Sequence, residues 1–247
     1  MRILVCIDDT DNLESRGTGE LASLLAEHLE VSGWGKASYV TRHQLLVHPD
    51  IPYTSHNSAM AFFAEISANF LPEFMTYAAD FLTHESAEGS DPGLCIVEMG
   101  RLKSGSGLIS FGVQCKQQVL TKAEAYAKAR DLDIHLSEHG GTGQGVIGAL
   151  AGAGLRLGGN DGRLKGQLRF DGKDSALSVA QLLAHPHVDA VRTEGGYHLL
   201  PIESVRLHDK VKSVLRGGES VLLVEPDTRG VAENCWKNLS RQQLKSY

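Results

Sequence analysis

The sequence predicts a protein of the α/β (α+β) class, and two observations lead to that prediction. Residues 2–7 are mostly β-branched or aliphatic, as in a short buried strand, and a polar run follows them at once. After that run, Leu21, Leu24, Leu25 and Leu29 recur at the spacing of one helical face. Farther along, strand-like apolar runs alternate with segments of helical pattern, which is typical of mixed α and β structure.

Each later element is predicted from apolar spacing, capping residues and turn residues. Pro72–Leu82 indicates a helix with Pro in its first turn, and Thr121–Glu124 is a capping box that opens a helix ending near Leu132. Ala59–Ile66 fits a strand and a helix equally well. Helices are predicted at 146–155 and 176–184, a hydrophilic linker at 103–107, and a partly ordered tail at 230–247. Extended segments are predicted at 37–48, 94–98, 108–115, 134–136, 164–170, 188–193, 197–202, 205–207 and 221–225.

Composition and charge are ordinary for a globular protein, with 42% hydrophobic and 22% charged residues. No apolar run is long enough to cross a bilayer, and Met1–Val5 leads into a strand without a signal-peptide pattern. We therefore expect a cytoplasmic protein without a membrane partner. The net charge of −6 comes entirely from residues 1–130, so the neutral remainder shows no electrostatic footprint for nucleic acid. The four cysteines form no C-x-x-C pair and indicate neither a zinc ribbon nor a disulfide framework.

The polar run after the first predicted strand is strongly acidic. Asp8, Asp9 and Asp11 lie within four positions at the carboxyl end of that strand, where open α/β sheets bind their ligands. Neighbouring carboxylates repel one another, and a fold that gathers them normally supplies a cation, commonly magnesium with a phosphate substrate. The alternative is a solvated turn in which an Asp or Asn caps the next helix. The number of carboxylates favours a metal or phosphoryl-transfer site.

A glycine-rich stretch, His139–Gly154, is the second unusual segment. Its first glycines indicate a loop whose backbone N–H groups can approach a ligand, and this loop leads into a helix N-terminus. Such a terminus attracts anions through its dipole. Glycine used only for close packing is the alternative. The stretch has no Walker lysine, because Gln144 stands between Gly143 and Gly145.

The segment Pro49–Ser58, with two prolines among mostly polar residues, predicts an irregular loop. Its tip, Thr54–Asn57, offers hydroxyl, imidazole and amide groups that can reach over a ligand. The alternative, which the sequence alone favours, is a surface loop that uses its Asn and Ser in turns.

Four short motifs occur in order between residues 2 and 155. They are Ile7-Asp-Asp-Thr-Asp11 with Thr18 and Leu21-Ala22, Pro49-Asp-Ile-Pro-Tyr53 with Asn57 and Ala59, Asp91-Pro-Gly93, and Gly143-Gln-Gly-Val-Ile-Gly-Ala-Leu-Ala151. Together they resemble the archaeal tRNA agmatidine synthetase family, whose members join agmatine to a wobble cytidine of a minor isoleucine tRNA using ATP. Four motifs in order are more specific than any one of them alone.

The resemblance implies an N-terminal kinase-like α/β domain that binds nucleotide, followed by a ferredoxin-like α+β domain. It implies that Asp8, Asp9 and Asp11 bind Mg²⁺ and the phosphates of ATP, and that Asp8, Asp9 and Thr18 are the catalytic residues. Asn57 would lie on the loop facing the site. The residues expected to bind the cofactor are Asp11, Thr10, Asn57, Gly143 and Gly145.

The chain also departs from the family pattern. The family's OB-fold domain and zinc ribbon have no counterpart among the remaining residues, which lack the cysteine pairs, so we expect a truncated homologue. Gln144 replaces a basic residue, and Ser55–Ser58 lacks the Arg and Gly that the family carries around the Asn. We place the domain boundary near residue 118, with the kinase-like domain at 1–118 and the ferredoxin-like domain with a C-terminal extension at 119–247.

The predicted function is Mg-ATP-dependent phosphoryl or nucleotidyl transfer to an unidentified second substrate, a small molecule or an RNA. The expected cofactors are therefore Mg²⁺ and ATP, and a homodimer is left open. One alternative is a non-catalytic module that binds a nucleotide or metabolite. Another is a protein-interaction scaffold in which the acidic turn only caps a helix.

Overall fold

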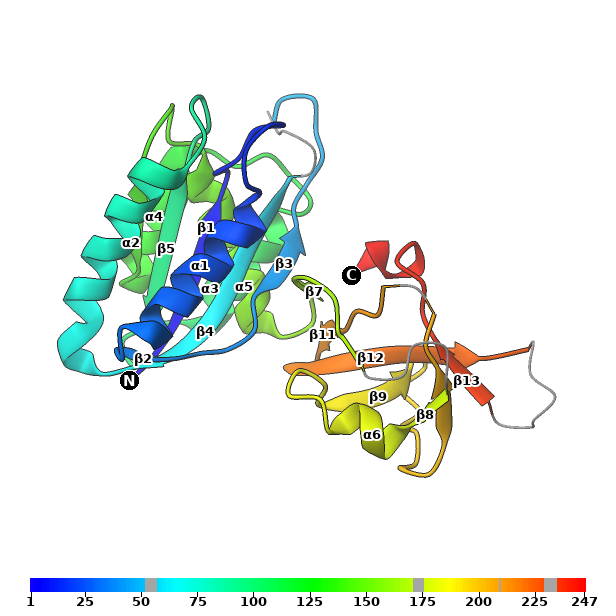
Figure 1. Ribbon diagram of the computed structural model, residues 1–247. Helices are drawn as coiled ribbons and strands as arrows, with labels where there is room; N and C mark the ends of the chain where they lie inside the picture. Colours follow the sequence, from blue (N-terminus) through cyan, green and yellow to red (C-terminus); the bar gives the residue numbers. More distant parts are fainter. Residues whose placement is uncertain (52–56, 171–175, 209, 229–234) are drawn as a thin grey trace. The chain divides into compact units, whose positions relative to one another are not determined.

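A computed structural model describes residues 1–51, 57–170, 176–208, 210–228 and 235–247 of the chain. These residues fall into two units, 1–158 and 159–247, which follow each other from blue to green and from yellow to red in Figure 1. The mixed α and β class expected from the sequence is confirmed. Within the described residues, no helix is both long and apolar enough to cross a membrane.

The first unit is built on an antiparallel sheet with β1 (Arg2–Asp8) at its centre. The order is β6 (His135–Glu138), β5 (Gly93–Glu98), β1, β4 (Ser58–Ile66) and β3 (Thr41–Gln44), and β2 (Gly35–Ala37) also pairs with β4. Both neighbours of β1 run opposite to it, and Asp8 pairs with Gly93. The edge where β1 ends therefore also carries the first residues of β4 and β5.

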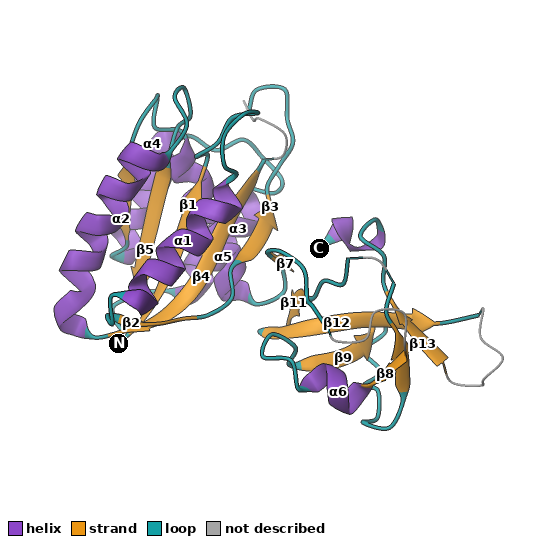
Figure 2. Cartoon of the chain, viewed as in Figure 1, coloured by secondary structure: helices purple, strands orange, loops and turns teal. Residues whose placement is uncertain are grey.

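The sheet is covered by helices on both faces, as Figure 2 shows. On one face lie α1 (Thr18–Val31) and α2 (Leu71–Glu85), and on the other lie α3 (Gly105–Gln114), α4 (Lys122–Leu132) and α5 (Gly145–Gly158). Residues of β1 alternate between the two cores, as the period of a strand requires: Ile3, Val5 and Ile7 pack under α1 and α2, whereas Leu4 and Cys6 face α5. The short 3-10 turn η1 (Ala68–Phe70) precedes α2.

Helices α1 and α2 share an unusual composition, because neither contains a Lys or an Arg. Their acidic residues are Glu20, Glu27, Glu30, Glu73, Asp80 and Glu85. Of these, Glu85 forms an ion pair with Arg16 in the loop before α1.

Helix α5 lies unusually close to its neighbours because glycines line its contacts. A Cβ on Gly154 would lie 2.3 Å from the carbonyl oxygen of Leu108 in α3, and a Cβ on Gly152 would lie 2.6 Å from Sγ of Cys6 in β1. Real Cβ atoms do not approach other atoms this closely. The glycines predicted to serve close packing therefore serve it along the body of α5.

The extended structure predicted for 108–115 is wrong, because these residues belong mainly to α3. The helix begins after Ser104, whose Oγ accepts the backbone N–H of Gly107 at 3.0 Å. The predicted linker at 103–107 is thus the helix N-terminus. The ambiguous segment Ala59–Ile66 is a strand, with its apolar residues buried on both faces of the sheet.

The division between the units lies after Gly158, later than the boundary predicted near residue 118. Three elements beyond that position, α4, β6 and α5, complete the first unit: β6 extends its sheet and α5 packs on β1, β4 and β5. Residues after 118 are therefore required for the core of the first unit.

The second unit is mostly strand. Its strands are β7 (Arg163–Leu164), β11 (Val214–Arg216), β12 (Glu219–Pro226), β13 (Cys235–Asn238), β10 (Ser204–Arg206) and β8 (Ala176–Ser178), in order of pairing, and β9 (Ala190–Thr193) pairs in parallel with β12. Its helices are α6 (Val179–Leu183) and the 3-10 turn η2 (Gln243–Ser246). The ferredoxin-like assignment stays a prediction.

Three predictions for the second unit need correction. The helix predicted at 176–184 is strand β8 followed by the short α6, because Ser178 caps α6 in a capping box with Gln181. Of 164–170 only the first residue lies in a strand, and 197–202 contributes one isolated bridge, between His198 and Arg192. Apolar residues alone did not distinguish these irregular segments from strands.

Candidate functional site

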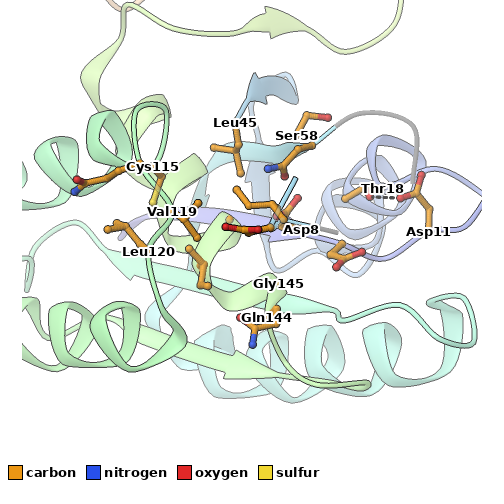
Figure 3. A pocket seen from close by; sticks show the side chains of 17 residues that line it. Asp8, Asp11, Thr18, Leu45, Ser58, Cys115, Val119, Leu120, Gln144 and Gly145 are labelled. Atoms are coloured by element: carbon orange, nitrogen blue, oxygen red, sulfur yellow. Dashed lines mark hydrogen bonds between the residues drawn. The ribbon is translucent and has the colours of Figure 1, made fainter. Parts of the chain in front are cut away.

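A pocket of about 340 Å³ opens at the edge of the sheet where β1 ends. This volume lies at the lower end of the range for small-molecule sites. Its lining is Asp8, Asp9, Asp11, Thr18, Leu45, Asp50, Ile51, Asn57, Ser58, Cys115, Gln118, Val119, Leu120, Gln144, Gly145, Ile147 and Gly148. In Figure 3, Asp11 and Thr18 lie on one side of Asp8, and Cys115, Val119 and Leu120 lie on the other. The pocket thus has an acidic part and an apolar part.

Two helices begin at this pocket. Thr18 is the first residue of α1 and Gly145 the first of α5, and both line the cavity. The N-cap of α1, Gly17, supplies no side-chain hydrogen bond to the first turn. The first backbone N–H groups of a helix lack partners within the helix and carry its partial positive charge. The pocket therefore presents two positive helix ends beside its carboxylates, an arrangement that can bind an anionic group.

The acidic turn concentrates negative charge in a buried place. Burial, followed by the charge of Asp9, raises the pKa of Asp8 well above its usual value. Burial and the charges of Asp91 and Asp11 raise the pKa of Asp9 to about 6. Asp9 also has a φ of 52°, in the left-handed region that a non-glycine residue seldom adopts. Charge repulsion and an unfavourable backbone conformation thus coincide at Asp9. A cationic or metal-bound ligand would relieve the charge repulsion.

The Asp9 carboxyl makes a testable contribution to stability. Because its pKa is about 6 in the folded state against an ordinary 3.8, the native state binds more protons than the unfolded state between those values. The ionised carboxyl therefore destabilises the fold at neutral pH. We expect Asp9→Asn to raise the melting temperature above pH 6 and this gain to shrink as the pH falls toward about 4. Asn also tolerates the left-handed backbone. A gain that is constant across thermal melts at these pH values would contradict this reading.

Glycines allow α5 to approach the acidic turn. A Cβ on Gly148 would lie 1.7 Å from Oδ2 of Asp8, and a Cβ on Gly145 would lie 2.0 Å from the carbonyl oxygen of Asp91. The backbone N–H of Gly145 donates to that same carbonyl at 3.1 Å. The glycines therefore let the first turn of α5 lie directly against the Asp8 carboxyl and the backbone of Asp91.

The structure brings most of the predicted site residues together. Asp8, Asp9, Asp11, Thr18, Asn57 and Gly145 all line the pocket. The hydroxyl of Thr18 donates to Oδ1 of Asp11 at 3.2 Å, so Asp11 orients it. The side-chain amide of Asn57 donates to the carbonyl oxygen of Leu46 at 2.7 Å and so fixes the chain beside the pocket. Their roles in binding and catalysis remain predictions.

Two predicted residues lie outside the cavity. Thr10 is fully buried, and its hydroxyl has no hydrogen-bond partner within the described part of the chain. Gly143 has a φ of 76°, and its α-carbon faces the carboxylate of Glu138, not the cavity. Positions 52–56 of the predicted polar loop at 49–58 lie outside the described residues.

The carboxylates of the pocket can be compared with the ligands that a magnesium ion requires. Among the described residues, no group of three or more His, Cys, Asp or Glu side chains could hold a metal ion. Asp8 and Asp9 nevertheless supply hard oxygen donors, and burial together with neighbouring carboxylates raises the pKa of both groups. Magnesium usually takes one or two carboxylates and completes its shell with water and substrate phosphates. The residues therefore fit a magnesium ion that arrives with a phosphate ligand.

The apolar part of the pocket was not predicted from the sequence. It is formed by Leu45, Ile51, Cys115, Val119, Leu120 and Ile147, which come from distant segments. Their only local signal was hydrophobicity, which equally describes core residues. Asp50 and Gln118 also line the cavity, and the described lining contains no Lys, Arg or His.

No protein-family model and no curated protein sequence matches the chain. Solved structures do match it. It is similar to apo TiaS, a tRNA agmatidine synthetase, with 28% identity and a TM-score of 0.53 over 62% of this chain and 35% of that one. It is similar to a tRNA fluorescent labeling enzyme, with 27% identity and a TM-score of 0.57 over 73% of this chain and 42% of that one.

A third similar structure is the complex of TiaS with its tRNA and ATP, with 23% identity and a TM-score of 0.55 over 80% of this chain and 48% of that one. The resemblance to the agmatidine synthetase fold predicted from the four motifs is confirmed. The chain spans less than half the length of each of these three proteins.

Proposed function

We propose that the protein is a Mg-ATP-dependent phosphoryl- or nucleotidyl-transfer enzyme related to tRNA agmatidine synthetase. One observation carries the proposal: the N-termini of α1 and α5 meet at a cavity whose wall holds Asp8, Asp9 and Asp11. Helix ends attract the phosphates of a nucleotide, and carboxylates suit the cation that accompanies them. The similarity to TiaS, which has been solved with tRNA and ATP, supports the same assignment.

The residues of the cavity divide between three tasks in this proposal. The positive N-terminal ends of α5 and α1 would attract the phosphate oxygens. Asp8 and Asp9 would hold magnesium, which would supply charge neutralisation at the transferred phosphoryl group. Asp11 holds the Thr18 hydroxyl in place. Catalysis then rests mostly on positioning and electrostatic stabilisation, as in other phosphoryl transfers.

The apolar part of the cavity suits a flat or apolar portion of a ligand, and a nucleoside base is such a portion. Leu45, Val119, Leu120 and Ile147 line this part. The second substrate, a small molecule or an RNA, would reach the transferred group from the open side.

Calorimetry of the protein with ATP, in the presence and absence of Mg²⁺, tests the proposal. We expect magnesium-dependent binding, followed by release of ADP or of AMP and pyrophosphate when the second substrate is supplied. Binding without any turnover across candidate small molecules and tRNA would favour the non-catalytic module. Absence of binding, together with a melting temperature that neither ATP nor Mg²⁺ changes, would favour the scaffold and refute the proposal.

A further inference from the structure

We infer that Asp91 is a positioning residue that locks the glycine-rich loop and the first turn of α5 against the acidic turn. The inference rests on the proposed function, because α5 is the helix whose first turn is proposed to receive phosphate. Asp91 lies just before β5 and is not among the residues that line the cavity. It therefore acts through the residues that it holds.

Asp91 connects three segments by its own polar groups. Its Oδ1 accepts the backbone N–H of Thr142 at 2.5 Å, and its Oδ2 accepts the Thr142 hydroxyl at 2.5 Å. Its carbonyl oxygen accepts the N–H of Gly145, the first residue of α5, at 3.1 Å. Its backbone N–H favours the ionised carboxylate of Asp9 and so acts to lower the pKa of that group. One residue thus joins the loop, the helix and the acidic turn.

The glycine-rich loop depends on these bonds to Asp91 because its backbone adopts φ values that are unfavourable for most residues. Gly141 and Gly143 have φ values of 58° and 76°, and a Cβ on Gly141 would lie 1.9 Å from Oδ1 of Asp91. Glycine loses more conformational freedom on ordering than any other residue, so such a loop needs external bonds to hold one conformation. Lys122 supplies a second set, donating to Glu138 at 2.8 Å and to the carbonyl oxygen of Thr142 at 2.9 Å.

The geometry also separates this role from that of a metal ligand. Both carboxylate oxygens of Asp91 are engaged by Thr142, and its negative charge raises the pKa of Asp9. An Asn at position 91 keeps the oxygen that accepts the Thr142 N–H, and its amide can donate to the Thr142 hydroxyl. A positioning residue therefore tolerates Asp91→Asn, whereas a metal ligand does not.

The test compares Asp91→Asn with Asp91→Ala by MgATP calorimetry. We expect Asp91→Ala to weaken binding about tenfold or more, the scale of one lost charge-assisted hydrogen bond, and Asp91→Asn to bind within about threefold of wild type. Thr142→Val weakens binding less, and in the Asp91→Ala background it adds nothing further, because both changes break the same contact. An equal loss in Asp91→Asn and Asp91→Ala, or fully additive effects, would overturn the inference.

A second measurement does not depend on nucleotide. We expect amide hydrogen exchange at Thr142 to be at least about tenfold faster in Asp91→Ala than in wild type, and nearly unchanged in Asp91→Asn. Lys122→Met serves as the matched loop variant, since it removes the other set of bonds and leaves those of Asp91. If wild type fails to bind MgATP while this exchange pattern holds, the proposed function is refuted, but the positioning of the loop by Asp91 is supported. Unchanged amide exchange at Thr142 in Asp91→Ala would refute the positioning role of Asp91.

Discussion

Asp8→Asn is expected to stabilise the ligand-free protein and to abolish its magnesium-dependent ATP turnover. Asp8 is buried, and burial and the charge of Asp9 oppose its ionised form in the folded state. Asn has nearly the same shape and no charge, so it fits beside Gly148 and relieves that penalty. We expect roughly 1–2 kcal/mol of added stability. Each kcal/mol corresponds to a rise in melting temperature of about 2–4 °C for a chain of this size.

The loss of turnover has a different origin. Removing a carboxylate that binds the metal removes electrostatic stabilisation of the transition state, and we expect at least about a hundredfold slower turnover. Asp11→Asn is expected to slow turnover as well, because it loosens the hold on the Thr18 hydroxyl. Thermal melts and a nucleotide product assay check both results. Glu14→Gln, an exposed change in the same loop, is the control. Wild-type turnover in Asp8→Asn would exclude the assigned metal role, and wild-type turnover in Asp11→Asn would exclude the positioning of Thr18.

Gly93→Ala is expected to be among the most destabilising small substitutions in the first unit. A Cβ at this position would lie 2.3 Å from the backbone C and O of Gly145 and 2.4 Å from the N of Val146. Backbone atoms cannot rotate away as a side chain can, so α5 must shift as a whole. We expect a loss of roughly 3 kcal/mol or more, at the upper end for overpacking. Displacement of α5 should also remove nucleotide binding.

Urea unfolding monitored by circular dichroism measures the effect of Gly93→Ala. Gly100→Ala is the matched control, because a Cβ there meets nothing within 4 Å and the backbone is not in the left-handed region. Equal unfolding midpoints for the two variants would show that α5 does not lie against the start of β5 as described.

The sequence was informative where a local pattern decides the structure. The first strand, the face of α1 and the capping box of α4 each depend on residues close together in the chain, and all were predicted. Helix α3 was missed, because Leu108–Cys115 is apolar and rich in residues that also form strands. It is a helix because Ser104 caps it and because Gly112 lets it pack against α5. The latter contact is tertiary and leaves no local signal.

The candidate site likewise contains residues that the sequence predicted and residues that it did not. The acidic turn and Gly145 could be found because they form short motifs, and they do line one cavity. Thr10 and Gly143 belong to the same motifs, but Thr10 lies in the protein interior and Gly143 lies in the glycine-rich loop beside Glu138. Leu45, with the other apolar lining residues, could not be found, because only the fold brings those segments together.

The composition of α1 and α2 bears on how a nucleic acid could approach this protein. The two helices place carboxylates along one side of the first unit and contain no Lys or Arg to offset them. Phosphodiester strands are repelled by such a field over a screening distance of roughly 8 Å at physiological ionic strength. If the second substrate is an RNA, it must therefore enter from directions that avoid this side, which limits the docking orientations open to it.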